Sequence, residues 1–187
     1  MNRYDPKGSS SPMFFATLRH RTSVFAIAAA ALLSLLTAPA ARADTPSEAR
    51  KAIQATYDKM NAAFSRKDVK SAFAYLTPDF EQITFEGQRV GAAPMRQQMN
   101  QALAAAKSMR SQTTVQKLTL KGGTAEVLVR SRVIIVLNDP RTNKPLTVAG
   151  NETSQDTWIK TSRGWLAKRS KTLSKKETIN GRPVPGA

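Results

Sequence analysis

The sequence predicts an α+β fold in which helices come first and an antiparallel β-sheet follows. The spacing of apolar residues indicates this order. They recur every three or four positions before residue 111, as on a helix, and alternate with polar residues after it, as on a strand. Short turns separate the alternating segments, and consecutive strands joined in this way pair antiparallel. A chain of 187 residues has room for one such domain.

Residues 1–43 are predicted to be a secretory signal peptide and not part of the fold. Basic residues precede an apolar run over Val24–Leu36, and Ala41-Arg42-Ala43 places small residues where signal peptidase reads them. The run is shorter than the roughly 20 residues that a helix needs to cross a bilayer. We therefore expect cleavage before Asp44 and a protein of the bacterial periplasm or exterior, with either Met1 or Met13 as the start.

The amino-acid composition limits which catalytic and metal-binding sites the domain can form. The only histidine, His20, lies in the predicted signal, and the chain has no cysteine. These counts exclude disulfides and a lipidated cysteine, and they remove Ser-His-Asp and Cys-His catalysis. They also argue against a zinc or haem site. We expect no cofactor and no metal.

The domain itself is basic, since residues 44–187 hold 24 Lys and Arg against 12 Asp and Glu. Basic residues crowd the last predicted strand, where no aromatic residue is interleaved among them, so nucleic acid is not an expected partner. The basic positions are Lys168, Arg169, Lys171, Lys175 and Lys176. We expect a solvated outer face, with weak contact to anionic lipid headgroups or cell-surface polyanions as the alternative. Stable membrane insertion is not expected.

Three helices and one short strand are predicted before residue 107. The first helix starts at a capping box, Thr45 to Glu48, and ends near Lys67. The second begins after Asp68 and runs to Leu76, the strand covers Phe80–Phe85, and the third helix follows. The apolar side of this third helix carries Met95, Met99, Ala102, Leu103 and Ala106.

Four strands are predicted after the helices. They cover Gln112–Lys121, Thr124–Leu137 and a hairpin over Val148–Leu173 that turns at Thr161–Gly164. The segment 177–187, with its prolines and glycines, is expected to be a flexible tail.

The closing hairpin carries a family resemblance. Asp156-x-Trp158 followed by Gly164-Trp165, behind three predicted helices and a two-strand meander, resembles the NTF2-like superfamily and its SnoaL-like (DUF4440-type) domains. The resemblance covers Ser47 to Lys176, within a domain expected over 44–176. It implies an α+β cone, with three N-terminal helices packed in a curved antiparallel β-sheet and a pocket between them. It also implies a homodimer through the outer face of the sheet.

The ketosteroid isomerases of this superfamily have a base Asp after the first short strand, a Tyr on the first helix and a second Asp near the last turn. The resemblance places these positions at Thr84, Met60 and Asp156, so one of the three matches. Scytalone dehydratase sites need histidines that the domain lacks. Known isomerase or dehydratase activities are therefore not expected.

Asp156 is the candidate polar anchor of a pocket, with Trp158, Tyr57, Met60 and Met99 as its apolar walls. Each has a plainer interpretation: an Asp beside a strand turn often bonds the backbone or a neighbouring Arg, and large apolar side chains usually fill a core. If Asp156 points inward, burial should raise its pKa. If it points outward among the basic residues, it should stay ionised.

The sequence thus favours a periplasmic or secreted domain that binds a small apolar or amphipathic ligand without a recognised catalytic constellation. Two alternatives stay open. One is an enzyme of isomerase or lyase type that uses Asp156. The other is a protein-interaction module that docks through the basic face of the sheet.

Overall fold

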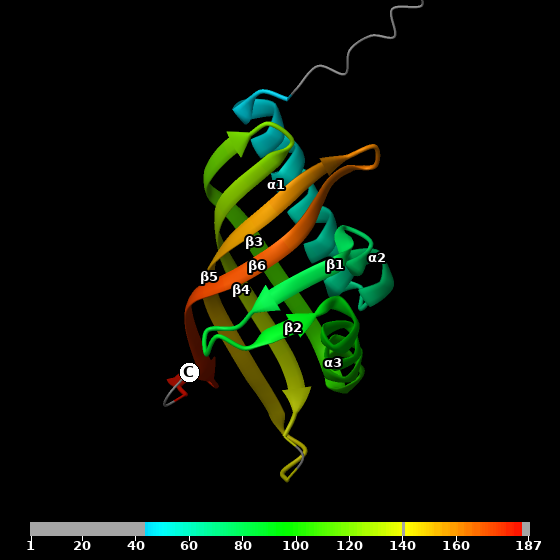
Figure 1. Ribbon diagram of the computed structural model, residues 1–187. Coiled ribbons are helices and arrows are strands. Elements are labelled where there is room, and N and C mark those ends of the chain that lie inside the picture. Colours follow the sequence, from blue (N-terminus) through cyan, green and yellow to red (C-terminus); the bar gives the residue numbers. More distant parts are fainter. Residues whose placement is uncertain (1–43, 140, 185–187) are drawn as a thin grey trace, which may run out of the picture. The chain divides into compact units, whose positions relative to one another are not determined.

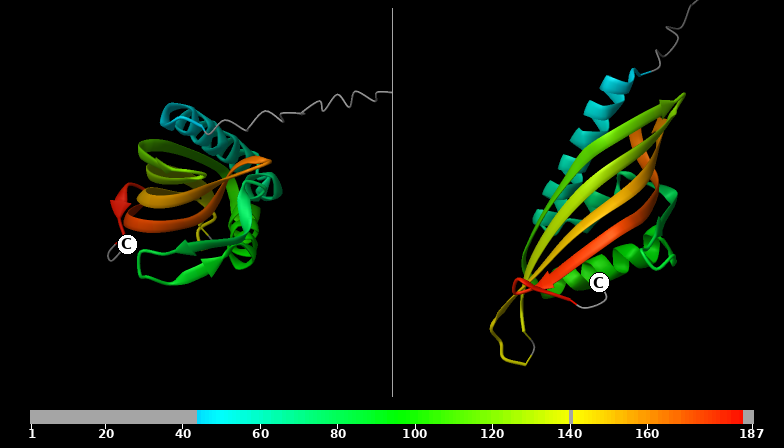
Figure 2. Two further views of the ribbon diagram at one scale, coloured as in Figure 1. Left: turned by 45° about the horizontal axis from the view of Figure 1, so that its top comes forward. Right: turned by 90° about the vertical axis from the view of Figure 1, so that its left-hand side faces the viewer.

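The computed structural model describes residues 44–139 and 141–184. This part of the chain forms an α+β domain with three helices, α1 (Pro46–Ser65), α2 (Val69–Phe73) and α3 (Ala92–Ala105), on the concave side of a curved sheet (Figures 1 and 2). The third helix follows the first two strands instead of preceding the whole sheet. The expected α+β class is confirmed.

The sheet is mixed, which corrects the expectation of a purely antiparallel one. Its order is β2-β1-β6-β5-β4-β3, with β7 paired to β6. Every pair is antiparallel except β1 with β6, which run parallel. A parallel pair needs a long connection, and here α3 and four strands lie between its two members. The strands are β1 (Leu76–Ile83), β2 (Arg89–Gly91), β3 (Ala106–Lys121), β4 (Thr124–Asn138), β5 (Pro145–Thr161), β6 (Gly164–Ile179) and β7 (Arg182–Pro183).

The start of α1 follows from local sequence. The Thr45 hydroxyl accepts from the Glu48 amide at 3.2 Å, and the Glu48 carboxylate accepts from the Thr45 amide at 2.7 Å. This is the expected capping box. Helix α2 is shorter than expected because Leu76 belongs to β1, where it pairs with Ala167 of β6.

In the described part of the expected tail, residues 177–184, the chain stays in the sheet, while residues 185–187 lie outside the described residues. Strand β6 continues to Ile179, and β7 follows after Asn180 and Gly181, both of which have positive φ. An Asn-Gly pair supplies the two left-handed residues that a tight hairpin needs. The flexibility of this segment stays a prediction.

Side chains along the antiparallel strands alternate between the inner and outer faces of the sheet, as the sequence predicts. Ala125, Val127 and Val129 of β4 are buried on the inner face, whereas Arg130 and Arg132 are exposed. Both tryptophans are buried, Trp158 completely. The inner face therefore carries the core on which the pocket is built.

Helix α1 also covers part of the outer edge of β3, a strand with one free edge in this sheet. The Gln54 side chain donates to the Thr113 carbonyl at 2.8 Å and accepts from the Val115 amide at 2.9 Å. Arg50 donates to the Val115 carbonyl beside it. Side chains of the helix thus satisfy backbone groups that an edge strand would otherwise expose.

Candidate functional site

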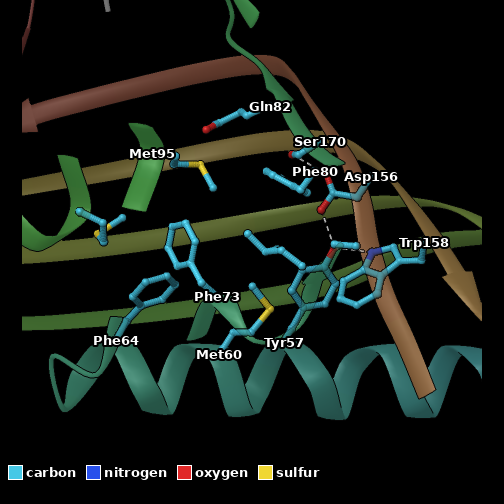
Figure 3. Close-up of a pocket in the computed structure, with 13 residues that line it drawn as sticks. Tyr57, Met60, Phe64, Phe73, Phe80, Gln82, Met95, Asp156, Trp158 and Ser170 are labelled. Atoms are coloured by element: carbon cyan, nitrogen blue, oxygen red, sulfur yellow. Dashed lines mark hydrogen bonds between the residues drawn. The ribbon is translucent and has the colours of Figure 1, made fainter. Parts of the chain in front are cut away.

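A cavity of about 240 Å³ lies between the helices and the inner face of the sheet (Figure 3). Its walls are mostly apolar, with polar side chains among the residues of β1, β5 and β6. The lining residues are Tyr57, Met60, Phe64, Phe73, Leu76, Phe80, Gln82, Met95, Met99, Asp156, Trp158, Ala167 and Ser170.

All five residues chosen from the sequence line this one cavity. Tyr57 and Met60 come from adjacent turns of α1, Met99 comes from α3, and Asp156 and Trp158 share the inner face of β5. The periods of helix and strand bring these side chains together. Their role in binding a ligand stays a prediction.

Hydrogen bonds connect three of these residues with Ser170. The Tyr57 hydroxyl donates to one oxygen of Asp156, and Ser170 donates to the other at 2.7 Å. The Trp158 indole N–H donates to the Tyr57 oxygen at 3.1 Å, and the two rings meet edge to face with centroids 5.0 Å apart. Figure 3 shows Asp156 above these two rings. The carboxyl is therefore held in one orientation.

Burial controls the protonation of this cluster. Asp156 is 7% exposed, and burial raises the pKa of its carboxyl, although the hydrogen bonds from Tyr57 and Ser170 act in the opposite direction. Burial, with the charge of Asp156, raises the pKa of Tyr57 well above its usual value. Tyr57 therefore stays a hydrogen-bond donor at neutral pH. The inward alternative for Asp156, with its raised pKa, agrees with the geometry.

The sequence does not predict Ser170 as a site residue, because a β-bulge decides which residue faces Asp156. In a hairpin without a bulge, counting residue pairs from the turn at Thr161–Gly164 would place Asp156 opposite Arg169. The register shifts between Thr157 and Trp158, and Asp156 pairs with Ser170 instead. A hydroxyl therefore stands where a guanidinium would have kept the carboxyl ionised.

Gln82 of β1 was also missed, since the sequence places no polar pocket residue on that strand. It lines the cavity, and within the described part of the chain its side-chain amide makes no hydrogen bond. Figure 3 shows its side chain above those of Phe80 and Met95. It offers the cavity both a donor and an acceptor.

Of the three positions that the ketosteroid isomerase resemblance selects, Met60 and Asp156 line the cavity and Thr84 does not. Thr84 lies beyond β1, accepts from the Gln88 amide at 3.2 Å and does not line the cavity. Met60 does line it, but the phenol that reaches Asp156 belongs to Tyr57, almost one helical turn earlier. The cavity therefore has an acid and a phenol, and no carboxylate base at Thr84.

Among the described residues, no group of three or more His, Cys, Asp and Glu is placed to hold a metal ion. In the same residues, no helix is long and apolar enough to cross a membrane.

A family model described as a SnoaL-like domain matches residues 45–171, most of the described chain. No curated protein matches the chain.

Solved structures of low identity share the fold. A "putative aromatic ring hydroxylase" of Novosphingobium aromaticivorans is 21% identical, with a TM-score of 0.56 over 72% of this chain and 96% of that one. A "putative dehydratase from the NTF2-like family" of Streptomyces avermitilis is 14% identical, with a TM-score of 0.55 over 68% and 96%. A domain of unknown function with a cystatin-like fold from Nostoc punctiforme is 21% identical, with a TM-score of 0.52 over 68% and 78%.

Proposed function

Because this chain belongs to the SnoaL-like domain family of the NTF2-like superfamily, we propose that its cavity is a binding site for a small, mainly apolar ligand that carries one polar group. One observation carries the proposal: a mostly apolar cavity into which a fixed, buried carboxyl projects. Its volume of about 240 Å³ lies below the roughly 300–1,000 Å³ of pockets that hold drug-sized molecules. The ligand is therefore small.

Asp156 supplies the polar contact. Its raised pKa favours the protonated form, which can donate a hydrogen bond to a ligand oxygen. Tyr57 and Ser170 fix its orientation, and Gln82 offers a second polar group. An isomerase or lyase could use the same acid, but it would also need a base, and Thr84 supplies none. We therefore propose binding without turnover.

We also propose that the protein is exported and that its mature chain begins at Asp44. The Asp44 carboxylate accepts from Lys160 at 2.6 Å and from the Trp165 indole at 2.8 Å. These contacts tie the expected first residue to the hairpin of β5 and β6. They support a folded domain that begins at this position.

Native mass spectrometry of protein isolated from the periplasm of its own host tests both proposals. We expect a chain mass that starts at Asp44 and an additional mass that is lost on denaturation. A chain that keeps residues 1–43 would reject the export proposal. A protein without bound mass that also fails to bind any member of a library of small apolar alcohols, ketones and acids would reject the ligand proposal.

Asp156→Asn then tests the anchor. Asparagine keeps an acceptor for Tyr57 but replaces the acidic O–H by a weaker amide N–H donor, so we expect affinity for the ligand found above to fall about threefold to tenfold, the effect of one neutral hydrogen bond. Thermal stability should not fall. The matched control, Asp79→Asn, changes an exposed aspartate whose partner is Lys168 and should leave affinity unchanged. Lost stability with unchanged affinity in Asp156→Asn would reject the anchor role.

A further inference from the structure

We propose that the outer face of the sheet binds a linear anionic polysaccharide. This face is convex (Figure 2), and its exposed cations include six on strands β3, β4 and β6. They are Arg110, Lys117, Arg130, Arg132, Lys171 and Lys176. Within the described part of the chain, none of the six forms an ion pair with a carboxylate. The face therefore presents positive charge that the domain does not neutralise.

The strand register places three of these cations in two adjacent rows across the sheet. In one row, Arg132 of β4 pairs with Gln112 of β3 and with Asn151 of β5, and Asn151 pairs with Lys176 of β6. The adjacent row holds Thr114, Arg130, Thr153 and Ser174. Neighbouring strands lie about 4.8 Å apart, so each row is roughly 14 Å long. Neither row contains an acidic residue.

Two shallow hollows follow these rows. Their volumes are about 260 and 230 Å³, and Arg130 and Asn151 border both. Glu152 also borders the first hollow, but its carboxyl accepts from the buried Thr172 at 3.1 Å. The hollows are thus lined mainly by guanidinium, amide and hydroxyl groups.

This chemistry fits a sugar chain with acidic groups better than other polyanions. Amide and hydroxyl side chains between the cations match sugar hydroxyls that alternate with sulfate or carboxylate groups. Single-stranded nucleic acid needs exposed aromatic side chains for stacking, and the two aromatic residues of β3–β6, Trp158 and Trp165, are buried. A flat bilayer would touch only the crest of a convex, hollowed face.

Calorimetry with a size-defined heparin octasaccharide, at about 0.15 M salt, tests the proposal. The double variant Arg130→Gln/Arg132→Gln should weaken binding at least about tenfold, because it removes two charge-assisted contacts. Lys51→Gln/Lys59→Gln makes the same charge change on the exposed side of α1 and should change affinity less than about twofold. Asn151→Ala, which changes no charge, should also weaken binding, and all variants should keep the wild-type melting temperature.

Three results would overturn the proposal. Equal losses of octasaccharide affinity in the two double variants would show that the octasaccharide is attracted by the net charge of the whole domain and not by this face. Tighter binding to phosphatidylglycerol vesicles than to the octasaccharide, lost in Arg130→Gln/Arg132→Gln, would assign the face to a membrane. An absence of octasaccharide binding by the wild-type protein would remove the site altogether.

Discussion

Asp156 and Glu152 are carboxyls on the inner face of β5, and burial raises the pKa of both. The charge of Asp156 raises the pKa of Glu152 further, while the Thr172 hydroxyl opposes the shift. Between the ordinary values of 3.8 and 4.5 and the raised values, the folded state binds more protons than the unfolded state. The free energy of unfolding therefore falls as pH rises through this range and levels off above it.

Carboxyls that are exposed or partly buried at the surface act in the opposite direction at lower pH. Hydrogen bonds lower the pKa of four of them, which are Asp44, Asp68, Asp79 and Glu86. Their contribution is present above their ordinary values and is lost as pH falls through the lowered ones.

We therefore predict that stability is greatest at mildly acidic pH. Urea unfolding between about pH 3 and pH 8 should show a maximum, and Asp156→Asn should flatten the decline on its neutral side. Asp79→Asn should leave that decline intact. Stability that rises steadily from pH 5 to pH 8 in the wild-type protein would contradict the raised values.

At the site, helix and strand periodicity place Tyr57, Met60, Met99 and Trp158 on inward faces, since a period of 3.6 or 2 can be counted along the chain. Asp156 was selected through the family resemblance, and the strand period adds that it shares a face with Trp158. The contact of Ser170 with Asp156 could not be counted in this way, because it depends on the bulge in β6. The same stretch of β6 also pairs with β1, about 90 residues earlier in the chain, so alternation within the hairpin alone does not predict the bulge.

At the scale of elements, locally determined features were predictable and long-range ones were not. The capping box fixed the start of α1, and the meander strands agree with their alternation. The end of α2 and the start of β3 depend on pairing with β6 and β4, and both differ from the expectation. The parallel pairing of β1 with β6 joins segments about 90 residues apart, and nothing in either segment specifies its direction.

The contact of α1 with the edge of β3 gives a prediction at this scale. Gln54→Ala removes the partners of the Thr113 carbonyl and the Val115 amide, so we expect a loss of about 1–3 kcal/mol in the free energy of unfolding. Gln97→Ala, on the exposed side of α3, is the control and should change stability by less than about 0.5 kcal/mol. Equal effects in urea unfolding would show that Gln54 contributes nothing to the edge.

At the scale of the whole molecule, the resemblance implies a homodimer through the outer face of the sheet, and this assembly stays a proposal. The same face carries the six unpaired cations, so two copies packed there would bring like charges together. Screening shortens the reach of this repulsion from about 10 Å at 0.1 M salt to about 3 Å at 1 M.

We therefore predict that any self-association through this face strengthens as salt rises, the reverse of the expected behaviour of polysaccharide binding. Light scattering over this salt range should show the average mass rising toward that of two chains, and Arg130→Gln/Arg132→Gln should reach it at lower salt because it removes part of the repulsion. Lys51→Gln/Lys59→Gln should follow the wild-type curve. A dimer that dissociates as salt rises would be held by opposite charges and so would use another surface, whereas a monomer at every salt concentration would leave the outer face free.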